Sequence, residues 1–309
     1  MHILVTGASG FVGGNIIQSL KDYKITAVGR SPIKSVHRNL CMNLDGATDY
    51  SEVLSGVDCV VHCAARIKNN GVKRCDELDR FRQDNVDVTT NLAQQAAKAG
   101  VKRFIFLSSA KVNGEVTPNG VKFLTSDRAA PQDCYGQTKY EAECALKKIG
   151  EETDLDVVII RPPLVYGYGV KGNMKTLVSL VSKGVPLPLG RADSPRSLVY
   201  IENLVSLVRV VIENPKAAGG TFFVSDDHDI STSDMVSLIA LTMERNPRLL
   251  PVHPRLMRLI LNLLVGVRIT SRLFDSLRLD INQTKDVLGW EPQVSVEVGF
   301  ERMIKGSRI

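Results

Sequence analysis

The chain has 309 residues, 44% of them hydrophobic, which is enough for a full core in one large domain or in two closely joined ones. Its net charge of +6 suits a small anionic ligand, but the basic residues are scattered and few aromatic residues accompany them, which disfavours a nucleic-acid surface. No uncharged apolar run reaches ~18 residues, so no membrane span is expected.

The first half of the chain alternates strand and helix patterns, which predicts a parallel sheet covered by helices. Strands are predicted at His2–Thr6, Lys24–Val28, around Cys41, Val57–His62, Arg103–Leu107 and Val157–Ile160. Helices are predicted at Gly10–Lys21, Cys75–Lys98 and Tyr135–Ile149. We therefore expect an α/β fold with a doubly wound, Rossmann-type sheet over residues 1–166.

Beyond Gly167 the sequence changes, because glycine and proline cluster there. Further elements are predicted as helices at Met174–Ser182 and Ser231–Glu244, the second capped by Ser231, and a strand at Thr221–Val224. That strand is expected to rejoin the first sheet. Residues 167–309 are otherwise predicted to form a smaller substrate-binding lobe at the carboxyl edge of the sheet, where open sheets bind ligands.

Cysteine and histidine usage gives no sign of a disulfide framework or a metal centre. The six cysteines form no C-x-x-C pair, and the five histidines are too dispersed for a predicted metal site. Reduced thiols in a cytoplasmic protein are expected, without a signal peptide, since the N-terminus runs straight into a strand. The apolar segment Arg255–Val267 is interpreted as a packed helix of the small lobe, with membrane contact as the alternative.

A glycine-rich turn follows the first predicted strand. Residues 3–14 read I-L-V-T-G-A-S-G-F-V-G-G, which places Gly7, Gly10 and Gly13 between a strand and a helix. Glycines there let the backbone approach a pyrophosphate, and the helix N-terminus supplies amides and a partial positive charge. A plain strand-to-helix turn is the alternative, but the position after the first strand favours a dinucleotide site.

A second motif, Y-G-Q-T-K, places Tyr135 and Lys139 one turn apart on one face of a predicted helix. The lysine ammonium can there lower the proton affinity of the phenol, which ordinarily titrates near ~10. A surface pair without a chemical role is the alternative, since most such pairs are of that kind, but the glycine-rich turn upstream favours a pair that exchanges protons near neutral pH.

Together these motifs resemble the short-chain dehydrogenase/reductase superfamily, and more closely its extended branch, the nucleotide-sugar epimerase/dehydratase/reductase family. The resemblance covers nearly the whole chain, through T-G-A-S-G-F-V-G, V-H-C-A-A, D-N-V-D-V-T, L-S-S-A-K-V-N-G, Y-G-Q-T-K, R-P-P-L-V-Y-G and a late L-G-W. It implies that Tyr135 is the general acid/base, that Lys139 binds the nicotinamide ribose and tunes Tyr135, and that Ser109 hydrogen-bonds the reacting sugar oxygen.

The resemblance also implies which residues bind the dinucleotide cofactor and the sugar substrate. At position 113 this chain departs from the family, because it has asparagine where relatives often have tyrosine. The implied cofactor-binding residues are Gly7, Gly10, Phe11, Val12, Gly13, Arg30, Asn43, Leu44, Cys63, Ala64, Ala65, Asn85, Leu107, Tyr135, Lys139 and Pro162. The implied substrate-binding residues are Ser109, Lys111, Asn113, Tyr135, Asn173, Arg196 and Arg272.

The end of the second predicted strand bears on the choice of cofactor. It reads V-G-R-S, so Arg30 stands where an NAD site would usually carry an acid for the ribose hydroxyls. Lys34, His37 and Arg38 add positive charge nearby. A cation suits the 2′-phosphate of NADP, so NADP(H) is favoured and NAD(H) remains possible. The alternative is an arginine that stacks on the adenine of NAD or is merely solvated.

Segments such as K-V-N-G-E, P-L-P-L-G and R-S-L-V-Y-I-E-N-L look like bacterial reductases of UDP-4-keto-6-deoxy-N-acetylhexosamines, which serve surface polysaccharide synthesis. We therefore expect a reductase of the 4-keto group. The alternatives are a UDP-glucose or UDP-N-acetylglucosamine 4-epimerase with tightly bound NAD, and a non-catalytic dinucleotide sensor. A dehydratase is disfavoured, because Ala110 follows Ser109 and no Asp-Glu pair comes next. Relatives often pair through two long helices, so a homodimer is expected through the helices ending near Lys98 and holding Tyr135.

Overall fold

The computed structural model describes residues 1–33, 36–67, 76–118, 120–253, 255–259 and 267–306. Lys34, Cys75 and residues 260–266 of the apolar segment, on which predictions were made, lie outside the described residues. Within the part that is described, we find no helix both long enough and apolar enough to cross a membrane.

A parallel sheet of seven strands forms the centre of the fold, in the order β3-β2-β1-β4-β5-β6-β9. The strands are β1 (His2–Thr6), β2 (Lys24–Gly29), β3 (Arg38–Cys41), β4 (Cys59–His62), β5 (Arg103–Leu107), β6 (Asp156–Arg161) and β9 (Thr221–Phe223). The chain reverses its direction across the sheet between β1 and β4, where doubly wound sheets bind dinucleotides. The predicted Rossmann-type α/β fold is confirmed.

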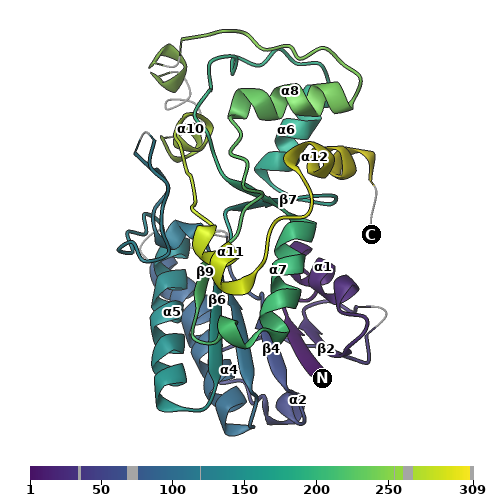
Figure 1. Cartoon of the computed structure of the whole chain (residues 1–309), viewed down its shortest axis with the longest axis vertical. Coiled ribbons are helices and arrows are strands. Elements are labelled where there is room, and N and C mark those ends of the chain that lie inside the picture. The colour runs from purple at the N-terminus through teal and green to yellow at the C-terminus, as the bar shows by residue number, and fades with distance from the viewer. Residues whose placement is uncertain (34–35, 68–75, 119, 254, 260–266, 307–309) are drawn as a thin grey trace.

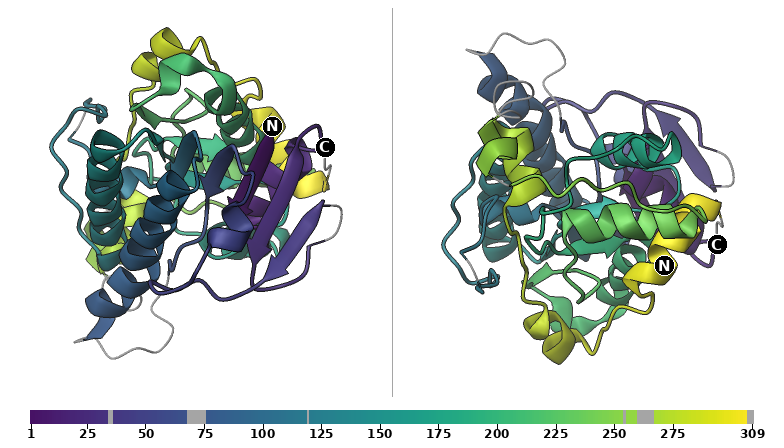
Figure 2. Two further views of the ribbon diagram at one scale, coloured as in Figure 1. Left: turned by 90° about the horizontal axis from the view of Figure 1, so that it is seen from below. Right: turned by 90° about the horizontal axis from the view of Figure 1, so that it is seen from above.

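Helices bury both faces of this sheet, which explains why its central strands β1, β4 and β5 read as near-continuous apolar runs. One face packs on α1 (Phe11–Ser19) and α7 (Ile201–Glu213), and the other on α2 (Ser51–Leu54), α4 (Val88–Lys98) and α5 (Cys134–Glu152). Adjacent strand residues point to opposite faces, so Val61 joins the first core and Val60 the second. Figures 1 and 2 show the resulting layers.

The region predicted as a single helix over residues 75–98 is interrupted by a wider turn. It consists of α3 (Glu77–Arg82), a π-helical turn (Gln83–Asp87) and α4, which follow one another without a gap. Single π turns inside α-helices frequently occur at functional sites. Asn85 lies on this turn and is buried.

The later part of the chain forms a lobe beyond the carboxyl ends of the strands, at the top of Figure 1. Its elements are β7 (Leu164–Tyr166), α6 (Asn173–Ser182), β8 (Leu198–Tyr200), α8 (Thr232–Thr242), α10 (Val267–Phe274) and α12 (Val296–Lys305), with α11 (Asn282–Leu288) returning beside β9. Strands β7 and β8 pair in parallel as a small second sheet. The predicted cap of α8 is confirmed, because Ser231 Oγ accepts from the Asp234 amide at 3.1 Å.

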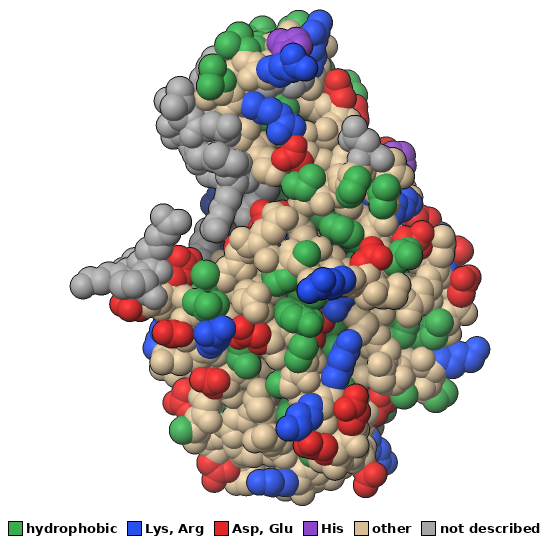
Figure 3. Space-filling view, turned by 90° about the vertical axis from the view of Figure 1, so that its left-hand side faces the viewer, with side chains coloured by type: hydrophobic (Ala, Val, Ile, Leu, Met, Phe, Trp, Pro, Cys, Tyr) green, Lys and Arg blue, Asp and Glu red, His purple; other side chains and the backbone are tan. Residues whose placement is uncertain are grey.

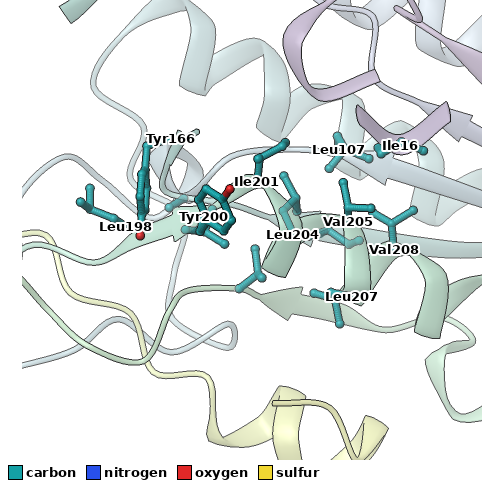
Figure 4. Packing of buried hydrophobic residues seen from close by; sticks show 14 of the residues in the cluster. Ile16, Leu107, Tyr166, Leu198, Tyr200, Ile201, Leu204, Val205, Leu207 and Val208 are labelled. Atoms are coloured by element: carbon teal, nitrogen blue, oxygen red, sulfur yellow. The ribbon is translucent and has the colours of Figure 1, made fainter. Parts of the chain in front are cut away.

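One apolar core continues from the main sheet into this lobe. Its residues in Figure 4 run from Ile16 and Leu107, beside the sheet, through Leu204 of α7 to Tyr166 and Tyr200 of the small sheet. Residues of α6 and α8 belong to the same cluster. The lobe is therefore fixed to the sheet by continuous packing.

A buried carboxylate adds polar contacts inside this core. Asp226 accepts hydrogen bonds from the Tyr166 hydroxyl at 2.8 Å, the Tyr200 amide at 2.8 Å and the Asn203 amide group at 2.7 Å. Burial raises the pKa of Asp226 to about 6, although these hydrogen bonds oppose the rise. One side chain thus ties together β7, the end of β8 and α7.

Candidate active site

Because the strands are parallel, the residues that follow them meet at one edge of the sheet. The predicted cofactor residues at this edge are Gly7 after β1, Arg30 after β2, Asn43 and Leu44 after β3, Cys63, Ala64 and Ala65 after β4, and Pro162 after β6, with Leu107 ending β5. The next residues after β5 are Ser108 and Ser109. The fold therefore brings the predicted cofactor loops and the predicted site serine to the same edge.

The glycine-rich turn is too tight for side chains. Gly7 has a positive φ of 66°, and a Cβ there would lie 2.6 Å from the Ala64 amide nitrogen. A Cβ on Gly13 would lie 2.4 Å from the Gly7 carbonyl oxygen. Helix α1 begins after Gly10, which has no side chain to cap it, so the amides of the first turn can serve an anion. This cradle fits the pyrophosphate of a dinucleotide.

Tyr135 and Ser109 form the hydroxyl pair of the site. Tyr135 is in the first turn of α5, and its hydroxyl is hydrogen-bonded to that of Ser109. Burial raises the pKa of Tyr135 above its ordinary value, and the charge of Asp133 raises it further, while the Ser109 hydrogen bond opposes the rise. The expected lowering of this pKa is therefore not produced by the polypeptide alone.

Lys139 is buried, one turn further along α5, and does not contact the phenol hydroxyl. Its Nζ donates to the Leu107 carbonyl at 2.7 Å and lies 6.0 Å from the centroid of the Tyr135 ring. Burial lowers the pKa of Lys139 to about 8, although Cys63 and Glu143 act in the opposite direction. The ammonium can therefore gain or lose its proton close to neutral pH.

Behind Lys139 lies a buried ion pair that the sequence analysis missed. Arg161 and Glu143 are 4% and 1% exposed, and they pair through two contacts of 2.9 and 2.5 Å. Ser108 donates its hydroxyl proton to the same carboxylate. Glu143 stands four residues after Lys139, so the spacing Y-x-x-x-K-x-x-x-E could have placed Glu143 on the helix face of Tyr135 and Lys139, but it contains no signal for Arg161. The pair joins α5 to the ends of β5 and β6.

Asn113 belongs to this buried network, which differs from the predicted contact with a substrate. It is 2% exposed, its Oδ1 accepts from Arg161 Nη1 at 3.0 Å, and its Nδ2 donates to the Leu124 carbonyl at 3.1 Å. Both ends of the amide are thus held by the protein. Lys111, also predicted to bind substrate, has its ammonium in contact with the carboxylates of Glu115 and Asp133.

The side chain of Asn85 holds the loop after β4. Its amide is engaged within the protein, so it is not free for the predicted direct contact with the cofactor. Its Oδ1 accepts from the Arg66 amide at 2.7 Å, and its Nδ2 donates to the Arg66 carbonyl and the Thr138 hydroxyl, both at 3.1 Å. Thr138 precedes Lys139 on α5. Asn85 therefore links the loop after β4 to the helix that carries Tyr135 and Lys139.

A directional chain of hydrogen bonds fixes His62 beside this loop. Thr89 donates to the Asn85 carbonyl at 2.6 Å, so its oxygen accepts from His62 Nε2 at 3.0 Å. His62 Nδ1 then accepts from Thr6 at 2.6 Å, and the Thr6 oxygen accepts from the Ala64 amide at 3.4 Å. Burial lowers the pKa of His62 to about 3, and a nearby ammonium adds to this. The imidazole is therefore neutral and structural.

The substrate-binding residues predicted in the second half of the chain lie at two places in the lobe, the start of α6 and the region of α10. Asn173 begins α6 and is exposed. The guanidinium of Arg196 donates to the Asp275 carbonyl, just after the end of α10. Arg272 is in α10, and its side chain lies outside the described part of the structure. Arg196 is therefore close to the helix that holds Arg272.

A basic cleft of about 910 Å³ lies along α1 and the loop after β2. Among the described residues that line it, Lys21, Arg30 and Lys171 are cations and none is acidic. Two other predicted cations have partners elsewhere: His37 accepts from the Ile25 amide, and Arg38 pairs with Glu52. On the face shown in Figure 3, by contrast, positive and negative side chains are interspersed.

Comparisons with known proteins identify the family of the chain. Residues 3–224 match the model of the NAD dependent epimerase/dehydratase family. A UDP-glucose 4-epimerase of Vibrio cholerae is 43% identical over 306 residues, which cover 97% of this chain and 93% of the relative. An undecaprenyl-diphosphate-linked N-acetylglucosamine 4-epimerase of Escherichia coli O157:H7 is 25% identical, over 79% of this chain and 73% of the relative.

Solved structures share the whole fold. MoeE5 in complex with UDP-glucuronic acid and NAD has a TM-score of 0.80 at 22% identity, covering 99% of this chain and 98% of that one. The UDP-N-acetylglucosamine 4-epimerase from Bacillus cereus also has a TM-score of 0.80, at 19% identity, covering 100% and 98%. The names of the two curated relatives favour the epimerase alternative over the reductase, and the family description, which names NAD, gives no support to a preference for NADP(H). The chain belongs to the NAD dependent epimerase/dehydratase family and is an enzyme of that family.

Proposed function

We propose that this chain is an NAD-dependent 4-epimerase of UDP-sugars. The observation that carries the proposal is the 43% identity, over nearly the full length of both chains, to a relative named UDP-glucose 4-epimerase. The contact between the Tyr135 and Ser109 hydroxyls supports it, because epimerisation at C4 requires one group that removes a proton from the sugar and later returns it.

The proposed roles follow from the contacts of each side chain. A bound NAD would supply the redox chemistry, as the acceptor of the hydride from C4 of the sugar and later as its donor to the other face. Tyr135 takes the proton of the 4-hydroxyl group and gives it back after the keto sugar has turned over. Ser109 donates a hydrogen bond to the same sugar oxygen and stabilises its developing charge. Lys139, charged below about pH 8, binds the ribose and favours the ionised form of the phenol.

For the cofactor we propose NAD(H), retained through the whole cycle. The family description names NAD, and an enzyme that returns the hydride it has taken gains nothing from exchanging its dinucleotide. The basic cleft around Arg30 supports a second candidate, the reductase, because three cations suit the 2′-phosphate of an exchangeable NADP(H). For the UDP diphosphate we keep Asn173, Arg196 and Arg272 as proposed ligands.

The deciding experiment uses the protein as purified, without added nicotinamide cofactor. It is incubated separately with UDP-glucose and UDP-N-acetylglucosamine, and the sugar signals are followed by NMR. A 4-epimerase converts at least one of the two UDP-sugars to a mixture of C4 epimers. A reductase leaves both UDP-sugars unchanged and consumes NADPH only with a 4-keto sugar. The dinucleotide released by denaturation is identified in parallel.

The matched control is Tyr135→Phe. It should still carry its dinucleotide but lose about 10²–10⁴ in kcat, because the proton acceptor is gone. A protein that only senses dinucleotide redox state would be indifferent to this substitution. Unchanged turnover in Tyr135→Phe would therefore overturn the proposed function.

We also propose two points of organisation. The first is a homodimer formed through α4 and α5. The second is a division of the chain near residue 166 into a cofactor-binding part and a mostly substrate-binding part. Exposed apolar side chains support the first proposal: Figure 3 shows them on the face that carries α5, and Tyr140 of that helix is 36% exposed. A single-chain mass in light scattering would exclude the dimer.

A further inference from the structure

Lys111 connects the two hydroxyl-bearing residues of the site. It lies in a short 3-10 helix, η3 (Ala110–Val112), directly after Ser109. Its backbone amide donates to Ser109 Oγ at 3.2 Å. Its side chain extends toward the start of α5, where the ammonium contacts Asp133 Oδ2. One residue thus holds Ser109 through its backbone and Asp133 through its side chain.

Asp133 in turn holds the helix that carries the phenol. Its Oδ1 accepts from the Gly136 amide at 2.7 Å and caps α5, so each of its carboxylate oxygens has a partner. Tyr135 is only two residues further along. The packing at this point is close, because a Cβ on Gly136 would lie 2.9 Å from the Lys111 carbonyl oxygen. The position of the phenol relative to Ser109 therefore depends on the contact between Lys111 and Asp133.

The same contact matters for the charge beside the phenol. Burial raises the pKa of Asp133, but the hydrogen bonds from Gly136 and Lys111 outweigh it and leave this pKa below its ordinary value. Asp133 is thus a carboxylate, and its charge raises the pKa of Tyr135 in addition to the effect of burial. Lys111 compensates part of that charge.

The charged and titratable groups around Tyr135 form two sets. On the side of η3 and the start of α5 are Lys111, Asp133 and Glu115, whose carboxylate also contacts the Lys111 ammonium. On the side of β4 and the next turns of α5 are Lys139, Cys63 and Glu143. Without the Lys111 ammonium, the first set would present two adjacent carboxylates and no cation.

We propose that Lys111 is a positioning residue for Tyr135: it fixes the start of α5 against Ser109 and compensates the charge of Asp133, so that the phenol can release its proton. The proposal rests on the proposed function and deepens it. It replaces the prediction that Lys111 binds the substrate, because the ammonium is engaged by Glu115 and Asp133 within the protein.

The first test measures the ionisation of Tyr135 without any substrate. Tyrosinate absorbance is titrated with pH in the holoprotein, and subtraction of the matching Tyr135→Phe variant isolates the one phenol. Lys111→Met should raise the midpoint by about one unit, which reduces the ionised fraction about tenfold, and Lys111→Arg should restore it. Adding Asp133→Asn to Lys111→Met should lower the midpoint again, because the uncompensated carboxylate is removed.

Asp133→Asn alone gives an independent variant should Lys111→Met fold poorly, since asparagine also caps helices. It should lower the midpoint of Tyr135 below that of the unmodified protein. A midpoint that stays unchanged in Lys111→Met, or in Asp133→Asn where the former does not fold, would overturn the proposal. This readout needs no turnover, so it stands even if no epimerisation is found and the proposed function fails.

The second test separates positioning from substrate binding by kinetics. Lys111→Met should lower kcat by about tenfold with KM within about twofold, and Lys111→Arg should recover most of the loss. The pH profile of kcat should move in the same direction as the phenol midpoint. A raised KM with unchanged kcat would assign Lys111 to substrate binding and overturn its positioning role.

Discussion

Glu143→Gln tests whether the buried ion pair behind Lys139 stabilises the site as a unit. The substitution removes the counter-charge of Arg161, which stays 4% exposed and is still held by Asn113. A buried cation stranded in this way costs about 3–5 kcal/mol. An unfolding entropy of about 2.1 cal/mol/K per residue gives about 0.65 kcal/mol/K for 309 residues. The unfolding midpoint should therefore fall by about 5–8 °C.

Differential scanning calorimetry at neutral pH, without added ligand, measures this shift. The matched control is Asp22→Asn, which breaks an Arg209–Asp22 pair whose side chains are 38% and 55% exposed. An exposed pair contributes about 0–1 kcal/mol, so the midpoint should move by less than about 2 °C. The double variant Glu143→Met with Arg161→Met should recover most of the loss, because apolar side chains can replace a buried pair at little cost. Equal shifts in Glu143→Gln and Asp22→Asn would refute the reasoning.

Three further predictions follow from single contacts. Gly13→Ala should abolish retention of the dinucleotide, because the new Cβ would lie 2.4 Å from a backbone oxygen. The control Gly14→Ala should retain the dinucleotide, because the nearest atom to its Cβ lies at 3.5 Å. The dinucleotide released on denaturation is measured by absorbance. The pKa of Asp226 is raised to about 6 in the folded protein, which therefore binds this proton more tightly than the unfolded chain does. The free energy of unfolding should consequently fall by roughly 3 kcal/mol as pH rises from about 4 to about 6. Urea denaturation should show this fall in the unmodified protein and not in Asp226→Asn. Turnover should decrease as pH rises through about 8, because Lys139 loses its charge there, which a pH profile of kcat measures.

Each of these predictions has an outcome that contradicts it. Retention of dinucleotide by Gly13→Ala would show that the turn can widen. A fall in stability of the same size in Asp226→Asn would assign the pH dependence to another group. A rate that stays level to about pH 10 would show that the proton on Lys139 does not matter for turnover.

Much of the nucleotide-binding half could be predicted from the sequence. Its central strands β1, β4 and β5 are buried on both faces, so they appear as apolar runs, and β1 and β5 have the bounds that the pattern predicts. The turn after β1 was predictable for the same local reason, because glycine tolerates the backbone of Gly7. The pair Tyr135 and Lys139 was predictable because both side chains belong to one helix face.

The remainder depends on contacts between distant segments. No element is predicted from the sequence over α7, although its apolar residues recur at helical spacing and are buried. The partners Glu143 and Arg161 are 18 residues apart in the chain, on a helix and a strand, and no local pattern pairs them. The roles of Asn85 and Asn113 likewise depend on which backbone groups the fold brings beside their amides.

The path of the chain between the sheet and the lobe has a consequence for engineering. After β6 it rises to α6, returns to the sheet at α7 and β9, rises again to α8, and comes back once more at α11 before ending in α12 (Figure 1). No single contiguous cassette therefore corresponds to the lobe. A chimera that swaps everything after residue 166 between relatives would also exchange an edge strand and a covering helix of the nucleotide-binding half. Altering substrate choice in this scaffold calls for scattered point substitutions instead of segment grafts.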